Sequence, residues 1–204
     1  MQKIGIMGGS FDPIHNAHIA MGRAAKERFG LDNVLYIPNA HTYYKKDHEM
    51  VSDEMRCDMV RLAIKPYPYM GISLIELLRG GITYTIDTIT ELYDTYPDSE
   101  IYFIIGGDSL VNLRTWRRAD ELLEKVIFLT VTRGDIDSEK TALLINEYKN
   151  DFPYSDIRQL PMEPMDISSS NIRKMLKAGE DVSEMIPPDV LSFIQKKGLY
   201  LREN

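Results

Sequence analysis

Residues 1–18 constrain the fold of this chain more than any other segment. The apolar run 3–7 leads into Gly8 and Gly9, and a helix then begins near His15 and His18. A buried strand, a glycine turn and a helix in this order are typical of a parallel α/β sheet. Glycine lets the backbone turn sharply and approach a ligand closely, and the start of a helix offers unpaired N–H groups to anions. This segment therefore predicts a phosphate-binding turn.

The two histidines are three residues apart, so they can share one face of the helix and press against a bound phosphate chain. The loop has neither the Gly-Lys-Ser/Thr sequence of a Walker A motif nor a Gly-x-Gly-x-x-Gly pattern. Two other interpretations remain open. One is a tight turn with two surface histidines. The other is a metal site, for which the sequence offers no third ligand nearby.

Strand-like and helix-like segments alternate along the rest of the chain. The predicted strands are 33–38, 70–74, 100–105, 126–131 and 156–160. The predicted helices are 52–65, 85–96, 140–151, 168–177 and 187–197. Strands separated by helices predict a parallel sheet with right-handed crossovers. In such sheets ligands bind at the carboxyl ends of the strands, and these ends carry Gly8, Asn39, Gly106, Asp108 and Arg133.

Charge and composition exclude several classes of protein. The formal net charge is −7, which argues against a general nucleic-acid binder. No apolar run approaches the length of a membrane span, and the N-terminus lacks the layout of a secretory signal. Cys57 is the only cysteine, so it cannot form an internal disulfide. It lies in a helical pattern and is expected in the core. Together these features predict a cytoplasmic protein with no nucleic-acid or membrane partner, and they leave the oligomeric state open, a homo-oligomer included.

A second phosphate-binding motif is predicted near the C-terminus. Ser168, Ser169 and Ser170 stand at the start of a helix, and Arg173 lies within reach of the same end. Hydroxyls, free N–H groups and a guanidinium suit a pyrophosphate. The alternative is an ordinary serine cap beside a solvated arginine.

Both motifs resemble those of the nucleotidylyltransferase superfamily. The segment from Gly8 to His18 is similar to its signature, which usually reads His-x-Gly-His, with Ala17 here in place of the glycine. The segment from Ile167 to Arg173 is similar to one that binds the β- and γ-phosphates of ATP in that superfamily. Alanine is the smallest replacement for glycine, so a slightly tighter site is expected.

Segments between the two motifs resemble the bacterial nicotinate mononucleotide adenylyltransferase family. They are Ile37-Pro38-Asn39, Thr83-Tyr84-Thr85-Ile86-Asp87-Thr88, Phe103-Ile104-Ile105-Gly106-Gly107-Asp108-Ser109-Leu110 and Thr115-Trp116. The resemblance implies a single α/β domain over residues 1–204, Rossmann-like and doubly wound with helices on both faces. Its C-terminal helical part, from about 165 to 204, would carry the second motif.

The same resemblance implies an activity and a set of roles. ATP and nicotinate mononucleotide would be the substrates, nicotinate adenine dinucleotide and pyrophosphate the products, and Mg²⁺ the companion of ATP without an assigned protein ligand. The implied catalytic residues are His15, His18 and Arg173. The implied ATP-binding residues are Gly8, Gly9, Ser10, Phe11, Gly106, Asp108, Ser168, Ser169 and Ile172. The implied residues for the mononucleotide are Asn39, Lys45, Thr85 and Trp116.

Some of these residues also have simpler explanations. Asp108 and Thr85 could cap helices, Trp116 could be a core residue, and Lys45 could be a solvated loop lysine. The loop around Lys45 departs from the family, because Tyr43 and Tyr44 replace the usual proline and histidine. A cation at Arg117 would favour a carboxylate over an amide.

Two other functions remain open at this stage. One is the same chemistry on nicotinamide mononucleotide or on another phosphate ester. The other is a non-catalytic nucleotide-binding protein of the same fold.

Overall fold

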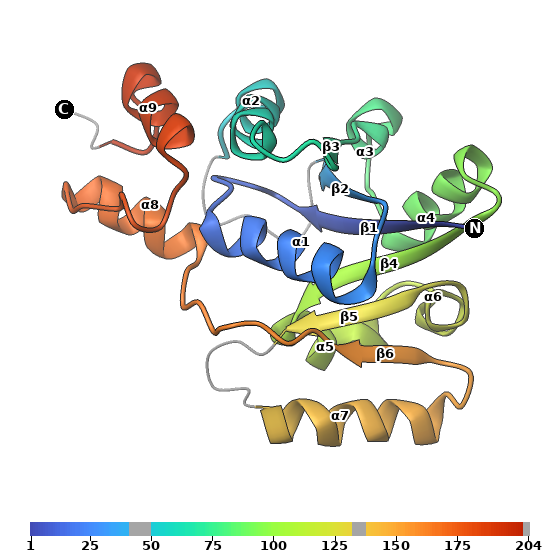
Figure 1. The fold of residues 1–204 in the computed structure, drawn as a ribbon. Coiled ribbons are helices and arrows are strands. Elements are labelled where there is room, and N and C mark those ends of the chain that lie inside the picture. Colours follow the sequence, from blue (N-terminus) through green and yellow to red (C-terminus); the bar gives the residue numbers. More distant parts are fainter. Residues whose placement is uncertain (41–49, 132–137, 202–204) are drawn as a thin grey trace.

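A computed structural model describes residues 1–40, 50–131 and 138–201. These residues form a six-stranded sheet in the order β3-β2-β1-β4-β5-β6, and every pair of neighbouring strands is parallel (Figure 1). The order steps outward from β1 in both directions, which makes the sheet doubly wound as predicted. The strands are β1 (Gln2–Gly9), β2 (Asn33–Pro38), β3 (Met70–Ile72), β4 (Ser99–Gly106), β5 (Ile127–Val131) and β6 (Asp156–Gln159).

Helices cover both faces of the sheet. One face packs against α1 (Asn16–Phe29) and α2 (Asp53–Ile64), and α8 (Ser169–Ala178) and α9 (Pro188–Lys197) share the same hydrophobic core. The other packs against α3 (Ile75–Arg79), α4 (Thr85–Thr95), α5 (Gly107–Asn112), the 3₁₀ helix η1 (Leu113–Thr115), α6 (Ala119–Lys125) and α7 (Ser138–Asp151). The helices α8 and α9 lie beyond the carboxyl ends of the strands, where α1 begins (Figure 1). The second predicted phosphate motif is thereby brought to the first.

Strand β4 divides its side chains between two cores. Ile101, Phe103 and Ile105 are buried in the core under α4 to α7, whereas Tyr102 and Ile104 are buried in the core under α1 and α2. Side chains of a strand alternate between the two faces of a sheet. A continuous apolar run is therefore what a strand buried on both faces requires.

Most predicted elements are confirmed. The side chain of Ser52 caps α2, since its Oγ accepts a hydrogen bond from the backbone N–H of Met55 at 3.3 Å. Helices α8 and α9 end at Gly179 and Gly198, both in the left-handed conformation that glycine tolerates. Strand β3 ends at Ile72, two residues before the predicted end. The short helices α3, α5 and α6 were not predicted.

Two further expectations concern the place of Cys57 and membrane-spanning helices. Cys57 is buried in α2, which confirms its predicted place in the core. Among the helices of the described ranges, none is long and apolar enough to cross a membrane.

Candidate active site

The carboxyl ends of β1 and β4 open into a cavity of about 1010 Å³. The starts of α1, α4 and α8 also reach it, as does the turn after β2. The predicted site residues that line it are Gly8, Gly9, Ser10, Phe11, His15, His18, Asn39, Thr85, Gly106, Asp108, Trp116, Ser168, Ser169 and Arg173. One cavity thus collects residues from both ends of the chain.

Of the other two predicted site residues, one lies elsewhere and one is outside the described part of the chain. Ile172 is fully buried in the core and does not line the cavity, because it sits on the inner face of α8. Lys45 lies outside the residues that the structure describes, as do Tyr43, Tyr44 and Arg133.

The turn after β1 is shaped by close packing of a ring. Phe11 adopts a φ of 47°, in the left-handed region, and only 1% of it is exposed. A Cβ atom at Gly9 would lie 3.1 Å from the Phe11 ring, so a side chain there would press against this buried ring. The ring in turn meets His18 edge-on, with centroids 5.1 Å apart. The packing of Phe11 against Gly9, the last residue of β1, therefore helps to set the position of a predicted catalytic imidazole.

The two histidines lie against one another at the start of α1. Their rings stack with centroids 3.7 Å apart, and the backbone N–H of His15 donates to Nδ1 of His18 at 3.3 Å. A ring nitrogen that accepts a hydrogen bond carries no proton, so His18 carries its proton on Nε2. His18 also lines the cavity.

The second motif is bonded directly to the first. Ser168 caps α8 by accepting a hydrogen bond from the N–H of Asn171 at 3.1 Å, as the serine-cap alternative predicted. The same residue also lines the cavity. Ser169 Oγ donates to the carbonyl of Pro13 at 2.8 Å, and Arg173 Nη1 donates to the carbonyl of Asp12 at 2.6 Å. These contacts fix the start of α8 against the loop that precedes α1.

A buried arginine that no sequence pattern indicated lies under the site. Arg56 of α2 is fully buried, and its guanidinium donates to the carbonyls of Ser10 at 2.6 Å and Asn39 at 2.7 Å. It also pairs with Asp53 at 2.6 Å. Arg56 thereby joins the turns that follow β1 and β2, both of which line the cavity.

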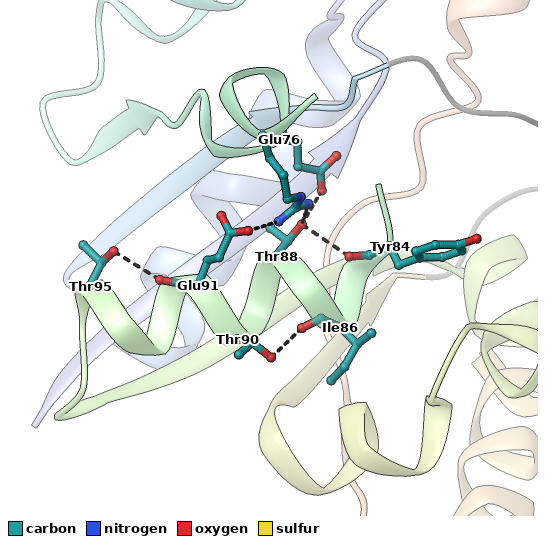
Figure 2. Close-up of polar contacts among 8 residues, drawn as sticks. Glu76, Tyr84, Ile86, Thr88, Thr90, Glu91 and Thr95 are labelled. Carbon is teal, nitrogen blue, oxygen red and sulfur yellow. Dashed lines mark hydrogen bonds and ion pairs between the residues drawn. The ribbon is translucent and has the colours of Figure 1, made fainter. Parts of the chain in front are cut away.

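Another missed residue is Glu76, which lines the cavity from α3. Figure 2 shows its carboxylate beside Thr88 of α4, whose hydroxyl donates to it at 2.8 Å. Arg79 donates to both Thr88 and Glu91, at 2.8 Å and 2.6 Å. Burial raises the pKa of the Glu76 carboxyl above its ordinary value. This network holds the start of α4, where Thr85 faces the cavity.

The neighbourhood of Trp116 combines packing with exposure to the cavity. Its ring meets Phe103 edge-on at 6.1 Å, and the residue is half-buried and lines the cavity. Thr85 is the first residue of α4, and the N-cap is Tyr84. Arg117 is exposed and stacks on the Tyr84 ring at 4.4 Å, and neither residue is among those that line the cavity.

Acidic side chains in the cavity are spread out. They belong to Glu76, Asp108 and Asp166. Within the described ranges, no group of three His, Cys, Asp or Glu residues could hold a metal ion. This donor set fits a cation that is held mainly by ligand oxygens and water.

Comparison with known proteins agrees with this geometry. The cytidylyltransferase-like family model matches residues 6–175. A "Probable nicotinate-nucleotide adenylyltransferase" of Lachnoclostridium phytofermentans is 38% identical over 98% of this chain and 100% of its own length. A relative of the same name from Carboxydothermus hydrogenoformans is 37% identical over 97% of this chain and 98% of its own.

Solved structures share the fold. Nicotinic acid mononucleotide adenylyltransferase of Plasmodium falciparum, complexed with NaAD, superposes with a TM-score of 0.77 at 22% identity, over 98% of each chain. The same enzyme complexed with APC gives a TM-score of 0.74 at 22% identity, again over 98% of each chain.

Proposed function

Since the chain belongs to the nicotinate-nucleotide adenylyltransferases of the cytidylyltransferase-like family, we propose that it transfers the adenylyl group of ATP to nicotinate mononucleotide. The products are nicotinate adenine dinucleotide and pyrophosphate, a step of NAD biosynthesis. The observation that carries the proposal is the shared cavity: the His15 and His18 pair and the Ser168 to Arg173 motif line it together.

The reaction needs two anions to be brought together in line. The nucleophile is a phosphate oxygen of the mononucleotide, and a phosphate monoester is largely dianionic at neutral pH because its second pKa is about 6. No general base is therefore needed. The task of the protein is to orient the two substrates and to stabilise charge on the α-phosphate and on the departing pyrophosphate.

The residues at the triphosphate end have the chemistry for that task. Gly8 and Gly9 let the backbone approach the phosphates, and the Nε2–H of His18 donates to a phosphate oxygen. Ser168, Ser169 and Arg173 bind the departing pyrophosphate through hydroxyls, N–H groups and a guanidinium. Asp108 accepts hydrogen bonds from the ribose.

The residues at the other end of the cavity suit the pyridine mononucleotide. Trp116 stacks on the pyridine ring, and Thr85 at the start of α4 binds its carboxylate through the hydroxyl or the backbone N–H. Asn39, at the carboxyl end of β2, lies on the way to the phosphate of the mononucleotide. Arg117 would act on the carboxylate only indirectly, because its guanidinium stacks on the Tyr84 ring.

Mg²⁺ is the divalent cation that we propose to accompany ATP. It would neutralise charge on the phosphate oxygens, and the scattered carboxylates of Asp108 and Asp166 would reach it through water. The other tasks of the reaction, orientation of the substrates and stabilisation of charge, depend on the residues of the chain itself.

The location and the domain organisation are also proposals. A cytoplasmic enzyme is supported by ATP as substrate and by the lone cysteine. The contacts of Ser169 and Arg173 with the loop before α1 support one nucleotidylyltransferase domain over residues 1–204, with residues 165–204 as its helical part.

Pyrophosphate release from ATP with each acceptor tests the function. We expect release with nicotinate mononucleotide and slower release with nicotinamide mononucleotide. A preference of about tenfold or less in kcat/KM, ~1.4 kcal/mol, would contradict strict selectivity for the acid form. Absence of release with either acceptor, in a parent protein that binds ATP, would favour the non-catalytic alternative.

A further inference from the structure

We infer that Tyr200 is a positioning residue for the triphosphate end of the cavity, which it serves by holding Asp12 and, through Asp12, Arg173. The inference rests on the proposed function, because it assigns Tyr200 a role in binding the phosphates of ATP and pyrophosphate.

The first contact joins the C-terminal segment to the loop before α1. The hydroxyl of Tyr200 donates to Oδ1 of Asp12 at 2.6 Å, a short bond of the charge-assisted kind. Asp12 is fully buried, and Tyr200 is half-buried. A buried carboxylate needs donors around it, and Tyr200 supplies one from a distance of 188 residues in the sequence.

The second contact joins the same aspartate to the phosphate-binding arginine. Arg173 Nη1 donates to the Asp12 carbonyl at 2.6 Å and lies 3.9 Å from Oδ2 of the carboxylate. Asp12 therefore stands between Tyr200 and Arg173 and contacts both. The next residue, Pro13, accepts the hydrogen bond of Ser169, so this short loop holds two residues of the second motif.

The backbone at Tyr200 adopts a costly conformation to make its contact. Helix α9 ends at Gly198, and the N–H of Leu199 donates to the carbonyl of Ile194 at 3.0 Å. Tyr200 then takes a φ of 62°, in the left-handed region that side chains other than those of glycine, asparagine and aspartate rarely adopt. Such strain persists where surrounding contacts enforce it, and here the contact is the bond to Asp12.

The protonation state of the tyrosine fits a permanent donor. Burial, together with the negative charge of Asp12, raises the pKa of Tyr200 far above its ordinary value. The hydroxyl therefore stays protonated throughout the range in which the protein would work.

Tyr200 acts on the ligand indirectly. Of the described residues, Arg173 lines the cavity, whereas Asp12 and Tyr200 do not. Loss of the Tyr200 hydroxyl should therefore affect the phosphates through Arg173 and leave the pyridine end, at Thr85 and Trp116, unchanged.

The variant Tyr200→Phe tests this, because it removes the hydroxyl and keeps the ring. Its control is Tyr93→Phe, which removes a hydroxyl that donates at 2.6 Å to the carbonyl of Lys125, on the face of the sheet that packs under α4. Both tyrosines are half-buried, and each variant loses one hydroxyl hydrogen bond of 2.6 Å, to a carboxylate in Tyr200→Phe and to a backbone carbonyl in Tyr93→Phe.

Binding of magnesium pyrophosphate, measured by calorimetry, is the first readout. We expect Tyr200→Phe to weaken it about fivefold or more and Tyr93→Phe to leave it within about twofold of the parent. In turnover assays, the KM for ATP should rise in Tyr200→Phe while the KM for nicotinate mononucleotide stays constant. Unchanged pyrophosphate affinity in Tyr200→Phe would overturn the inference.

A double-mutant cycle separates positioning from general stability. In an Asp12→Asn background, Tyr200→Phe should change pyrophosphate affinity by less than about twofold, because the connection to Arg173 is already lost. If Asp12→Asn does not fold, Arg173→Lys serves as the second member of the cycle. A full effect of Tyr200→Phe in either background would show that Tyr200 acts by another route. Pyrophosphate binding requires no turnover, so its result stands apart from any failure of the parent to transfer adenylyl groups.

Discussion

The backbone N–H of His15 donates to Nδ1 of His18, and the two imidazoles stack with their centroids 3.7 Å apart. The hydrogen bond forces the proton of His18 onto Nε2 and orients the ring at the same time. His18 therefore has a structural role at the start of α1 beside the role of phosphate donor that we propose for it.

Two substitutions at His18 separate these roles. In His18→Asn the amide oxygen can replace Nδ1 as acceptor for the His15 N–H, but the Nε2 donor is lost. We expect its kcat to fall about 100-fold, as when one preorganised donor to a phosphoryl oxygen is removed, with little change in Tm. His18→Ala should lose as much activity and also about 1 kcal/mol of stability, because the start of the helix loses its cap. Equal melting temperatures for the two variants would contradict the capping role.

Arg56 should matter for stability and for the shape of the site. Arg56→Leu leaves the buried carbonyls of Ser10 and Asn39 without their donor, so we expect a loss of about 3 kcal/mol in urea unfolding. Surviving folded enzyme should show raised KM values for both substrates, because the two turns no longer share an anchor.

The control for Arg56 lies on the same helix. Arg61 pairs with Asp58 at 2.9 Å, but both side chains are more than 40% exposed, at 48% and 41%. Arg61→Leu should therefore cost less than about 1 kcal/mol. A similar loss for the two leucine variants would show that the burial of Arg56 contributes nothing.

The contrast between these arginines explains what sequence patterns could and could not predict. Both stand in an amphipathic helix where a charged residue usually faces water. Arg56 is buried because the turns at Ser10 and Asn39 close over it, and no local pattern records that tertiary contact. Glu76 and Tyr200 were missed for the same reason.

The sheet and the serine cap were predictable because their signals are local. Gly8 and Gly9, expected in a turn, instead end strand β1 opposite Ile37 and Pro38. Strand β4 is a continuous apolar run that stops at glycine, and Ser52 caps α2 as a serine should. The short helices α3, α5 and α6 carry no such signal. Their N-cap residues, Leu74, Gly106 and Arg118, make no side-chain capping bond. They form because the chain must connect packed elements there.

Trp116 should report on the mononucleotide. It is the only tryptophan of the sequence, and it lines the cavity beside Phe103. Nicotinate mononucleotide should change the intrinsic fluorescence saturably, because a pyridine ring stacked on the indole alters its environment. Trp116→Phe should raise the KM for the mononucleotide about fivefold and leave the KM for ATP nearly constant. An ATP analogue alone is the control ligand, and an equal fluorescence change with it would contradict the placement.

Glu76 should make the folded protein less stable as the pH rises. Burial raises its pKa, although hydrogen bonds from Thr88 and Thr83 and the charge of Arg79 oppose the shift. A carboxyl with a raised pKa binds its proton more tightly in the folded state. The free energy of unfolding therefore falls as the pH rises from the ordinary pKa of 4.5 through the raised value. Glu76→Gln cannot ionise, so its stability should fall less than that of the parent over this interval, as measured by urea unfolding at a series of pH values.

Glu121 supplies a control of opposite sign. The hydrogen bond from Arg118 lowers its pKa, so its contribution is present above its ordinary value of 4.5 and is lost as the pH falls. Relative to the parent, Glu121→Gln should therefore lose stability at higher pH, whereas Glu76→Gln should gain it. Because Glu121 is exposed, solvent screens its pair and the effect should be the smaller of the two. If both glutamine variants shift in the same direction with pH, burial does not raise the pKa of the Glu76 carboxyl.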